Sequence, residues 1–186
     1  MTDVVTMPQT HGKITENAPL APLVWFKSGG PAEWLFEPKD IADLQQFLRD
    51  LDPSFAVWPL GLGSNLIIRD GGIRGVVVRL GKAFAGIETD GLTLRCGAGA
   101  PGISGMEFLR GIPGTIGGAV RMNAGAYGRE VSDILQSADV VLRNGDLVTI
   151  PLADIGYSYR HSDLPDGSIV VSATMVGESG DPEIIG

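Results

Sequence analysis

The spacing of apolar residues predicts one clear helix in the first third of the chain. Residues 39–51 place five apolar side chains on one helical face, and Pro53 follows just beyond the last of them. The five are Ile41, Leu44, Phe47, Leu48 and Leu51. The first twenty residues are polar and lack a clear period, so we expect an extended arm or a short capped helix there.

Most other apolar runs are short and indicate strands. Gly-Gly-Pro at 29–31 predicts a turn between two strands within residues 24–38, because proline cannot donate to a sheet ladder. The dipeptides Asp90-Gly91 and Asn144-Gly145 suit positive φ angles and predict two hairpins. Further strands are expected at residues 55–61, 66–70, 75–81 and 167–177. Residues 102–128 are too rich in glycine for one regular element and predict short helical pieces separated by loops.

Strands therefore dominate a chain with few helices, which indicates an α+β fold with at least two small sheets. A length of 186 residues suits one globular unit or two small ones. We expect an N-terminal arm over residues 1–22, a first subdomain over 23–82 and a second over 83–186.

Charge and cysteine content narrow the possible partners. The net charge is −8 and no run of Lys or Arg occurs, which argues against nucleic acid and anionic membranes. Cys96 is the single cysteine, so an intrachain disulfide and a multi-cysteine metal site are excluded, and no carboxylate–histidine spacing predicts a metal. No signal-peptide pattern or run of about 20 apolar residues is present, so we expect a cytoplasmic protein.

A glycine-rich loop follows the strand expected at 55–61. Residues 61–65 read Gly-Leu-Gly-Ser-Asn, and Leu66 stands where a dinucleotide-binding pattern would have its third glycine. No Gly-Lys-Ser/Thr phosphate loop occurs either. Successive N–H groups in such a loop can bind an anion, whereas an ordinary turn has the same composition. The loop alone leaves both interpretations open.

A second glycine-dense segment favours the anion-binding interpretation of the first loop over an ordinary turn. It holds six glycines within residues 111–128, namely Gly111, Gly114, Gly117, Gly118, Gly125 and Gly128. Close packing of a helix on a sheet would also need glycines. Two such segments in one small acidic protein favour a large phosphate-bearing cofactor that lies between two subdomains.

Four segments together resemble the UDP-N-acetylenolpyruvoylglucosamine reductase family. VWFKSGGPAEWLFEP, PLGLGSNLIIRDGGIRGVVVRL, GMEFLRGIPGTIGGAVRMNAGAYG and GYSYRHSDL occur in the family's order and approximate spacing, over residues 24–176. The resemblance implies the two-subdomain FAD-binding fold of the vanillyl-alcohol oxidase-like type. It also implies a flavoenzyme of bacterial peptidoglycan synthesis, in which NADPH is the reductant and UDP-N-acetylglucosamine enolpyruvate is reduced through FAD to UDP-N-acetylmuramate.

The resemblance further implies which residues bind FAD. The first glycine loop would hold the pyrophosphate through backbone N–H groups, and the second would lie against the flavin and its phosphates. The residues that match are Gly61, Leu62, Gly63, Ser64, Asn65, Leu66, Ile112, Pro113, Gly114, Thr115, Gly117, Gly118 and Ala119.

Arg160, within SYRHSD, matches the family's catalytic arginine. Negative charge builds on the substrate carboxylate as hydride reaches the vinyl carbon, and a fixed guanidinium stabilises that charge. Tyr159 and Asn123 are expected to bind substrate, although a core position explains Tyr159 equally well. Three further cations, Lys27, Arg69 and Arg121, are candidates for a phosphate contact, with plain surface charge as the more common outcome.

The sequence departs from the family in two places. A helix that the family carries before the second glycine segment is missing, because Pro101 runs directly into Gly102. The chain also stops at GDPEIIG, where the family continues into a substrate-binding domain with a proton-donating serine and a late glutamate. We therefore expect an FAD-binding portion without that C-terminal domain, or a sequence with residues missing at Pro101–Gly102 and at Ile185–Gly186.

Two alternatives to the reductase stay open. One is another FAD-dependent oxidoreductase of the same fold, such as a sugar or alcohol oxidase. The other is a non-catalytic FAD-binding fragment. In each case we expect a monomer.

Overall fold

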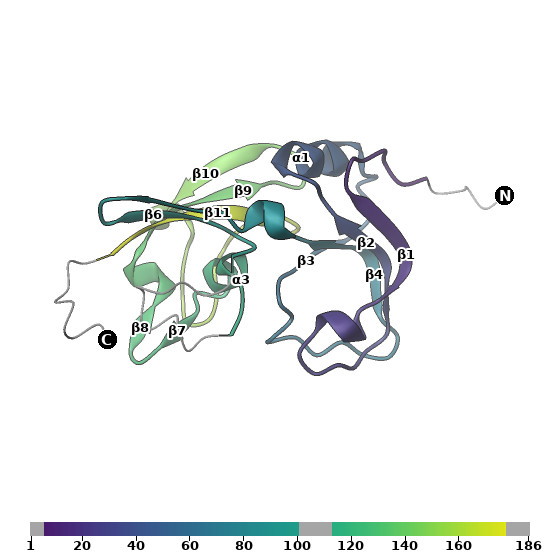
Figure 1. Ribbon diagram of the computed structural model, residues 1–186, viewed down its shortest axis with the longest axis horizontal. Helices are drawn as coiled ribbons and strands as arrows, with labels where there is room; N and C mark the ends of the chain where they lie inside the picture. The colour runs from purple at the N-terminus through teal and green to yellow at the C-terminus, as the bar shows by residue number, and fades with distance from the viewer. Residues whose placement is uncertain (1–5, 101–112, 178–186) are drawn as a thin grey trace.

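The computed structural model describes residues 6–100 and 113–177, which form two sheets with a short hairpin beside the second (Figure 1). The Pro101–Gly102 junction, Ile112 and the Ile185–Gly186 junction lie outside the described residues. The expectations for these positions therefore stay predictions.

The first sheet has the strand order β1-β2-β4-β3. Its strands are β1 (Lys13–Pro19), β2 (Pro31–Glu37), β3 (Val57–Leu60) and β4 (Ile73–Arg79). Strand β1 is antiparallel to β2, whereas β2 and β3 both run parallel to β4. Because β4 lies inside the sheet, its Val76, Val77 and Val78 are buried.

Helix α1 (Ile41–Asp50) confirms the helix expected from the apolar spacing. It begins at Asp40, whose carboxylate accepts a 2.9 Å hydrogen bond from the Asp43 backbone N–H, as an N-cap residue does. Its apolar face packs on the sheet, where the Phe47 ring stacks on Phe36 with the ring centroids 4.0 Å apart.

The N-terminal segment differs from the expected arm or helix, because Lys13–Pro19 form the edge strand β1. Just before this strand, the backbone N–H groups of His11 and Gly12 each donate a 2.8 Å hydrogen bond to the carboxylate of Asp43. Asp43 is buried, so these bonds satisfy a carboxylate that would otherwise lose its solvation. His11 and Gly12, just before β1, are thereby bound to the first subdomain.

Two expected strands are absent from the described chain. Residues 24–28 follow the 3₁₀ turn η1 (Ala21–Leu23) as a loop, and residues 66–70 are irregular as well. In the first loop Val24 enters the core while Trp25 and Phe26 remain exposed. In the second loop Ile68 is buried and Leu66 packs partly buried against the same cluster, while Ile67 is exposed. The buried apolar residues of both runs contact the core without pairing in a sheet.

The second sheet is antiparallel, with the order β10-β9-β11-β6-β5. Its strands are β5 (Ile87–Asp90), β6 (Thr93–Gly97), β9 (Leu135–Val141), β10 (Leu147–Pro151) and β11 (Ile169–Val176). Both predicted hairpins are confirmed, and their turn glycines, Gly91 and Gly145, have φ angles of 58° and 84°.

Between β6 and β9 lie helix α3 and a two-stranded hairpin. Their bounds are α3 (Ile116–Arg121), β7 (Gly125–Ala126) and β8 (Arg129–Glu130), and the remaining 3₁₀ turns are η2 (Lys82–Phe84), η3 (Val131–Asp133) and η4 (Leu152–Asp154). Of the segment 102–128, where short helical pieces and loops are expected, residues 113–128 are described, and they hold the short helix α3 and also the strand β7. No helix in the described part of the chain is long and apolar enough to cross a membrane.

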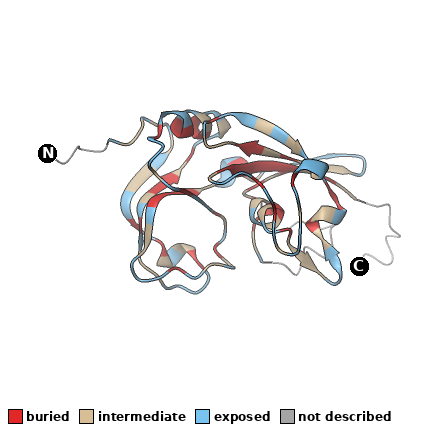
Figure 2. Cartoon of the chain, turned by 180° about the vertical axis from the view of Figure 1, so that it is seen from behind, coloured by how far each residue is buried: buried red, intermediate tan, exposed pale blue. Residues whose placement is uncertain are grey.

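The two sheets share part of one core. Phe36 and Phe47 of the first subdomain pack in the same cluster as Val141, Ile169 and Val171 of the second. Figure 2 shows buried residues along the strands of both sheets and on α1. This shared core fixes the sheets relative to each other and holds the loop after β3 opposite α3 (Figure 1).

Candidate functional site

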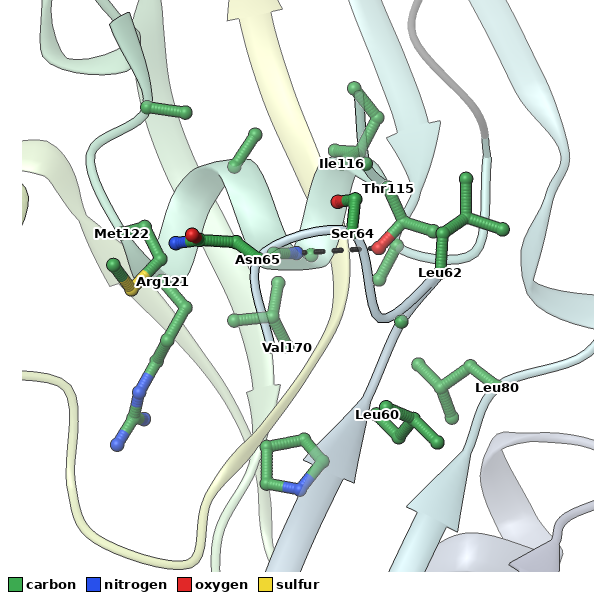
Figure 3. Close-up of a pocket in the computed structure, with 18 of the residues that line it drawn as sticks. Leu60, Leu62, Ser64, Asn65, Leu80, Thr115, Ile116, Arg121, Met122 and Val170 are labelled. Carbon is green, nitrogen blue, oxygen red and sulfur yellow. Dashed lines mark hydrogen bonds between the residues drawn. The ribbon is translucent and has the colours of Figure 1, made fainter. Parts of the chain in front are cut away.

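A cavity of about 540 Å³ lies between the two subdomains (Figure 3). Its walls come from the end of β3 and the loop after it, from β4, from α3 and from the start of β11. The predicted FAD-binding residues that are described all line it: Gly61, Leu62, Gly63, Ser64, Asn65, Leu66, Pro113, Gly114, Thr115, Gly117, Gly118 and Ala119. Segments about fifty residues apart in the sequence thus meet at one site.

The two glycine segments touch each other directly. The Ser64 hydroxyl donates a 2.6 Å hydrogen bond to the carbonyl oxygen of Pro113. A Cβ atom added at Gly61 would lie 2.6 Å from Thr115 Oγ1, well inside van der Waals contact. Gly61 is therefore needed for the approach of the two protein loops as well as for the approach of any ligand.

The first loop presents free backbone donors. Within residues 6–100 and 113–177, the N–H groups of Leu62, Gly63, Ser64 and Asn65 have no hydrogen-bond acceptor. Gly63 has a φ angle of 61°, in the left-handed region, and a Cβ there would lie 2.7 Å from Val24 Cγ1. Consecutive unpaired N–H groups of this kind form a concave site for an anion.

The second loop is divided between structural and free donors. The N–H groups of Ile116 and Gly117 donate to Ala100 and Ala98 carbonyls, at 3.1 and 2.9 Å. A Cβ at Gly117 would lie 2.9 Å from the Ala98 Cβ, so this glycine allows α3 to pack closely on the end of β6. The N–H groups of Gly114 and Thr115 have no acceptor in the described chain.

Only two of the described residues that line the cavity carry a charged side chain, and both are arginines. Arg121, at the end of α3, donates to the Pro165 carbonyl and the Ser168 hydroxyl, both at 3.2 Å. The second is Arg160. Asp166 lies 3.9 Å from Arg121 and Glu130 lies 3.1 Å from Arg160, but neither carboxylate is among the described residues that line the cavity. The lining therefore favours an anionic ligand. Of the other candidate cations, Lys27 instead donates to the Pro22 carbonyl.

Arg160 is held in a defined orientation. It lies in a turn closed by two 3.1 Å hydrogen bonds between Ser158 and His161, and its own φ angle is 55°. Its Nη1 donates to the Asn123 carbonyl at 3.0 Å and to Glu130 Oε1 at 3.1 Å, while Nη2 donates to the Gly125 carbonyl at 2.8 Å. The predicted catalytic arginine thus lines the cavity, and hydrogen bonds within the protein hold its guanidinium in place.

The two predicted substrate-binding residues occupy different environments. Tyr159 is 81% exposed, and its ring centroid lies 4.9 Å from Arg160 Cζ, a cation–π geometry. This position does not fit a core tyrosine. Asn123 is buried, and its amide is fully engaged with Glu130, Ser158 and Ser132. Both N–H groups of the Asn123 side chain thus donate within the protein, and its expected role in substrate binding stays a prediction.

Glu130 is the participant that the sequence did not suggest. Its carboxylate contacts both Arg160 and Asn123, at 3.1 and 2.8 Å. It lies seven residues after Asn123 and thirty before Arg160, so no local spacing points to it. The one sequence signal was its place in the segment GAYGRE beside the second glycine cluster.

Other titratable residues near the site have structural partners. Tyr157 donates a 2.8 Å hydrogen bond to the Val120 carbonyl, and burial raises the pKa of its phenol well above the ordinary value, so it stays protonated. His161 Nε2 lies 2.9 Å from Asp163 Oδ1. Burial raises the pKa of the Cys96 thiol. Among the described residues, no group of His, Cys, Asp or Glu side chains could hold a metal ion.

The cavity has the features that a flavin dinucleotide requires. Apolar side chains of Leu60, Leu80 and Val170 lie beside the loops and offer surface for a flat ring (Figure 3). Unpaired N–H groups and Arg121 offer donors for phosphates. Among the described residues, a Cβ added at Gly114 would meet only Ser64 Oγ, at 3.7 Å, so this glycine leaves room for close approach to the backbone. The residues present therefore fit FAD.

Comparison with known proteins supports the same cofactor. The model of a family described as "FAD binding domain" matches residues 32–151. UDP-N-acetylenolpyruvoylglucosamine reductase from Sphingopyxis alaskensis is 63% identical over 192 residues, covering 97% of this chain and 64% of the relative. The enzyme of that name from Erythrobacter litoralis is 64% identical over 188 residues, covering 95% and 58%. The chain thus spans about three-fifths of the length of these relatives.

Solved structures support the predicted fold. The reductase from Thermus caldophilus superposes with a TM-score of 0.77 at 30% identity, over 95% of this chain and 66% of that one. 6-Hydroxy-D-nicotine oxidase from Arthrobacter nicotinovorans gives a TM-score of 0.65 at 16% identity, over 92% and 43%, which supports the fold alone. The α+β FAD-binding fold and the resemblance drawn from the sequence are confirmed.

Proposed function

The chain belongs to the FAD binding domain family, and we propose that it is the FAD-binding part of a UDP-N-acetylenolpyruvoylglucosamine reductase. This enzyme would use NADPH to reduce UDP-N-acetylglucosamine enolpyruvate to UDP-N-acetylmuramate, a cytoplasmic step of peptidoglycan synthesis. The observation that carries the proposal is the meeting of two glycine loops and Arg160 at one cavity. Relatives that bear this enzyme's name are 62% identical or more in three species.

FAD, when bound, supplies hydride-transfer chemistry at its ring. The chain's own residues would perform three tasks around it. The N–H groups of residues 62–65, with those of Gly114 and Thr115, would bind the diphosphate. Apolar residues such as Leu60 and Val170 would exclude water from the ring.

Arg160 would carry out the third task, which concerns the substrate. Hydride addition to the vinyl carbon pushes negative charge onto the adjoining carboxylate. A guanidinium fixed before the reaction stabilises that charge without reorganisation, so it lowers the barrier rather than merely tightening binding. Its three hydrogen bonds to protein acceptors provide this fixed orientation. Tyr159, stacked on the guanidinium, would help to bind the same substrate.

The experiment compares full-length wild-type protein with Arg160→Ala. The control is Arg74→Ala, at an exposed position on β4 away from the cavity. The readouts are NADPH oxidation that depends on the enolpyruvate substrate and the dissociation constant of FAD. We expect Arg160→Ala to lower kcat by about 100-fold and to leave the dissociation constant of FAD unchanged. The control variant should keep both the kcat and the dissociation constant of the wild-type protein.

Two outcomes would contradict the proposal. Oxidation of a sugar or alcohol by O₂, with no response to the enolpyruvate, would identify an oxidase of the same fold. Retention of FAD without any NADPH-dependent turnover in the full-length protein would identify a non-catalytic flavin-binding protein. Near-normal turnover in Arg160→Ala would overturn the catalytic role of Arg160 but would leave the proposed function standing.

A further inference from the structure

We propose that Glu130 is a positioning residue, which orients Arg160 so that its remaining N–H groups are available to the substrate carboxylate. The inference rests on the proposed function and extends it from Arg160 to the group behind it. Glu130 would not touch the substrate or the flavin itself.

Glu130 is the point where two parts of the site are joined. Its Oε1 accepts from Arg160 Nη1 at 3.1 Å, and its Oε2 accepts from Asn123 Nδ2 at 2.8 Å. The residue also caps the 3₁₀ turn η3, in which its backbone N–H donates to Asp133 Oδ2 at 2.7 Å. Its position is therefore set by its own turn, independently of Arg160.

The number of donors on the guanidinium defines what remains for a ligand. Arginine has five N–H groups. Within the described chain, three of them have acceptors, namely the carbonyls of Asn123 and Gly125 and the carboxylate of Glu130. The Nε–H and one Nη2–H have none. These two belong to adjacent nitrogens, which is the arrangement that binds a carboxylate through both of its oxygens.

Arg160 needs such a support because its conformation is otherwise unfavourable. Arg160 and Asn123 both lie in the left-handed region, with φ angles of 55° and 43°. Non-glycine residues stay there only when their surroundings hold them. The Arg160 side chain is 37% exposed, so without its acceptors it would sample many rotamers. Gly125 leaves the space that the guanidinium fills, since a Cβ there would lie 2.9 Å from Nη1.

A carboxylate is the side chain that fits between these two donors. Arg160 Nη1 and Asn123 Nδ2 both donate, so the residue between them must accept on both sides. Glutamine would present an NH₂ group to one of them. Asn123 cannot rotate its amide to compensate, because its Oδ1 accepts from the Ser132 backbone N–H at 3.0 Å. Glu130→Gln thus removes the support with almost no change of volume.

The test is a double-mutant cycle in the FAD-loaded, full-length protein. The variants are Glu130→Gln, Arg160→Lys and the two combined, and the control is Glu88→Gln on the exposed strand β5. We measure kcat and KM for UDP-N-acetylglucosamine enolpyruvate and the dissociation constant of FAD. We expect Glu130→Gln to lower kcat about tenfold, with FAD affinity unchanged. The double variant should be no slower than Arg160→Lys alone, because Glu130 acts through Arg160.

Multiplying effects in the double variant, or a parallel loss of FAD affinity in Glu130→Gln, would overturn the inference in favour of a general structural role.

A second readout needs neither substrate nor turnover. The Arg160 Nε–H cross-peak in ¹H–¹⁵N spectra is identified by its loss in Arg160→Lys, and we expect it to broaden or shift in Glu130→Gln. An unchanged cross-peak would overturn the positioning role even in an active enzyme. Absence of turnover in the wild-type protein would instead overturn the proposed function and leave this spectroscopic result to decide the role of Glu130.

Discussion

The Ser64 hydroxyl donates a 2.6 Å hydrogen bond to the carbonyl oxygen of Pro113, and this bond joins the two glycine segments at the cavity. One segment belongs to the first subdomain and the other to the second. Gly61 and Thr115 touch beside it, so the spacing of the two loops is set by protein contacts before any cofactor is present. A preformed spacing reduces the ordering that binding would otherwise require.

Gly61→Val should separate the loops and weaken FAD binding by at least about tenfold. The Cβ of the new side chain would lie 2.6 Å from Thr115 Oγ1, which is too close for van der Waals contact. The dissociation constant of FAD, from titration of flavin fluorescence, measures the effect. The matched control is Gly71→Val, since an added Cβ at Gly71 has no heavy atom of residues 6–100 or 113–177 within 4 Å. Equal affinities in the two variants would show that loop spacing does not matter for the cofactor.

Ser64→Ala should have a smaller effect of the same kind. It removes one hydrogen bond between partly exposed groups, for which a net contribution of about 1 kcal/mol is typical. FAD affinity should therefore fall by up to about fivefold. The midpoint of thermal unfolding without FAD should fall by about 2–4 °C, because the bond is already present in the FAD-free protein. Ser64→Thr keeps the hydroxyl and is expected to restore most of the affinity. If both variants bind FAD like the wild-type protein, the bond does not position the loops.

Elements with a strong local signal were predictable from the sequence. Helix α1 has a full apolar face and an Asp40 cap, and the hairpins at Gly91 and Gly145 need glycine at positive φ. The strands predicted from the apolar runs at 24–28 and 66–70 were wrong, because Val24 and Ile68 are buried by contacts with distant residues and not by strand pairing. Apolar character indicates burial, but only the pairing partner determines whether a buried residue lies in a strand.

Some features of the candidate site were likewise predictable from the sequence, and others were not. The glycine segments were recognisable as loops that approach a ligand, and the resemblance singled out Arg160. The sequence could not reveal that Gly117 serves the packing of α3 on Ala98, or that Asn123 is consumed by internal hydrogen bonds. Glu130 was missed for the same reason, since its partner Arg160 is thirty residues away. Long-range contacts of single side chains leave no periodic trace in the sequence.

Arg143 should stabilise the junction of the two subdomains. It follows β9, and its guanidinium donates to the carbonyls of Leu48 and Asp52 near the end of α1, at 3.1 and 2.9 Å. Carbonyls at a helix end lack partners within the helix, so the arginine satisfies and caps them. We expect Arg143→Ala to lower the free energy of unfolding by about 2 kcal/mol in urea denaturation.

Arg143→Lys tests whether charge alone is sufficient at this position. A single ammonium cannot place donors on both carbonyls as the planar guanidinium does, so it should recover less than half of the loss. The control, Arg74→Ala on the exposed side of β4, should stay within about 0.5 kcal/mol of the wild-type protein. A loss of similar size in the control would mean that Arg143 has no special role at the junction.

Asp139 should make the stability of the second sheet depend on acid pH. Burial alone would raise its pKa, but hydrogen bonds from Ser172, Thr149 and Arg95 outweigh burial and hold the pKa below its ordinary value. The Asp139 carboxylate lies 2.6 Å from both the Arg95 guanidinium and the Ser172 hydroxyl. Because the folded-state pKa is lowered, the stabilisation is complete above the unfolded-state pKa of about 4 and is lost as the pH falls through the folded-state value.

The midpoint of thermal unfolding should therefore fall between about pH 5 and pH 3, and Asp139→Asn should reduce that dependence. At pH 7 the same variant should be less stable by about 2 kcal/mol, because the hydrogen bonds to a charged acceptor are weakened. The control is Asp70→Asn, at an exposed loop position, which should keep the wild-type slope. If Asp139→Asn shows an unchanged slope over this range, acid sensitivity comes from other carboxylates and the Asp139 network contributes nothing measurable to it.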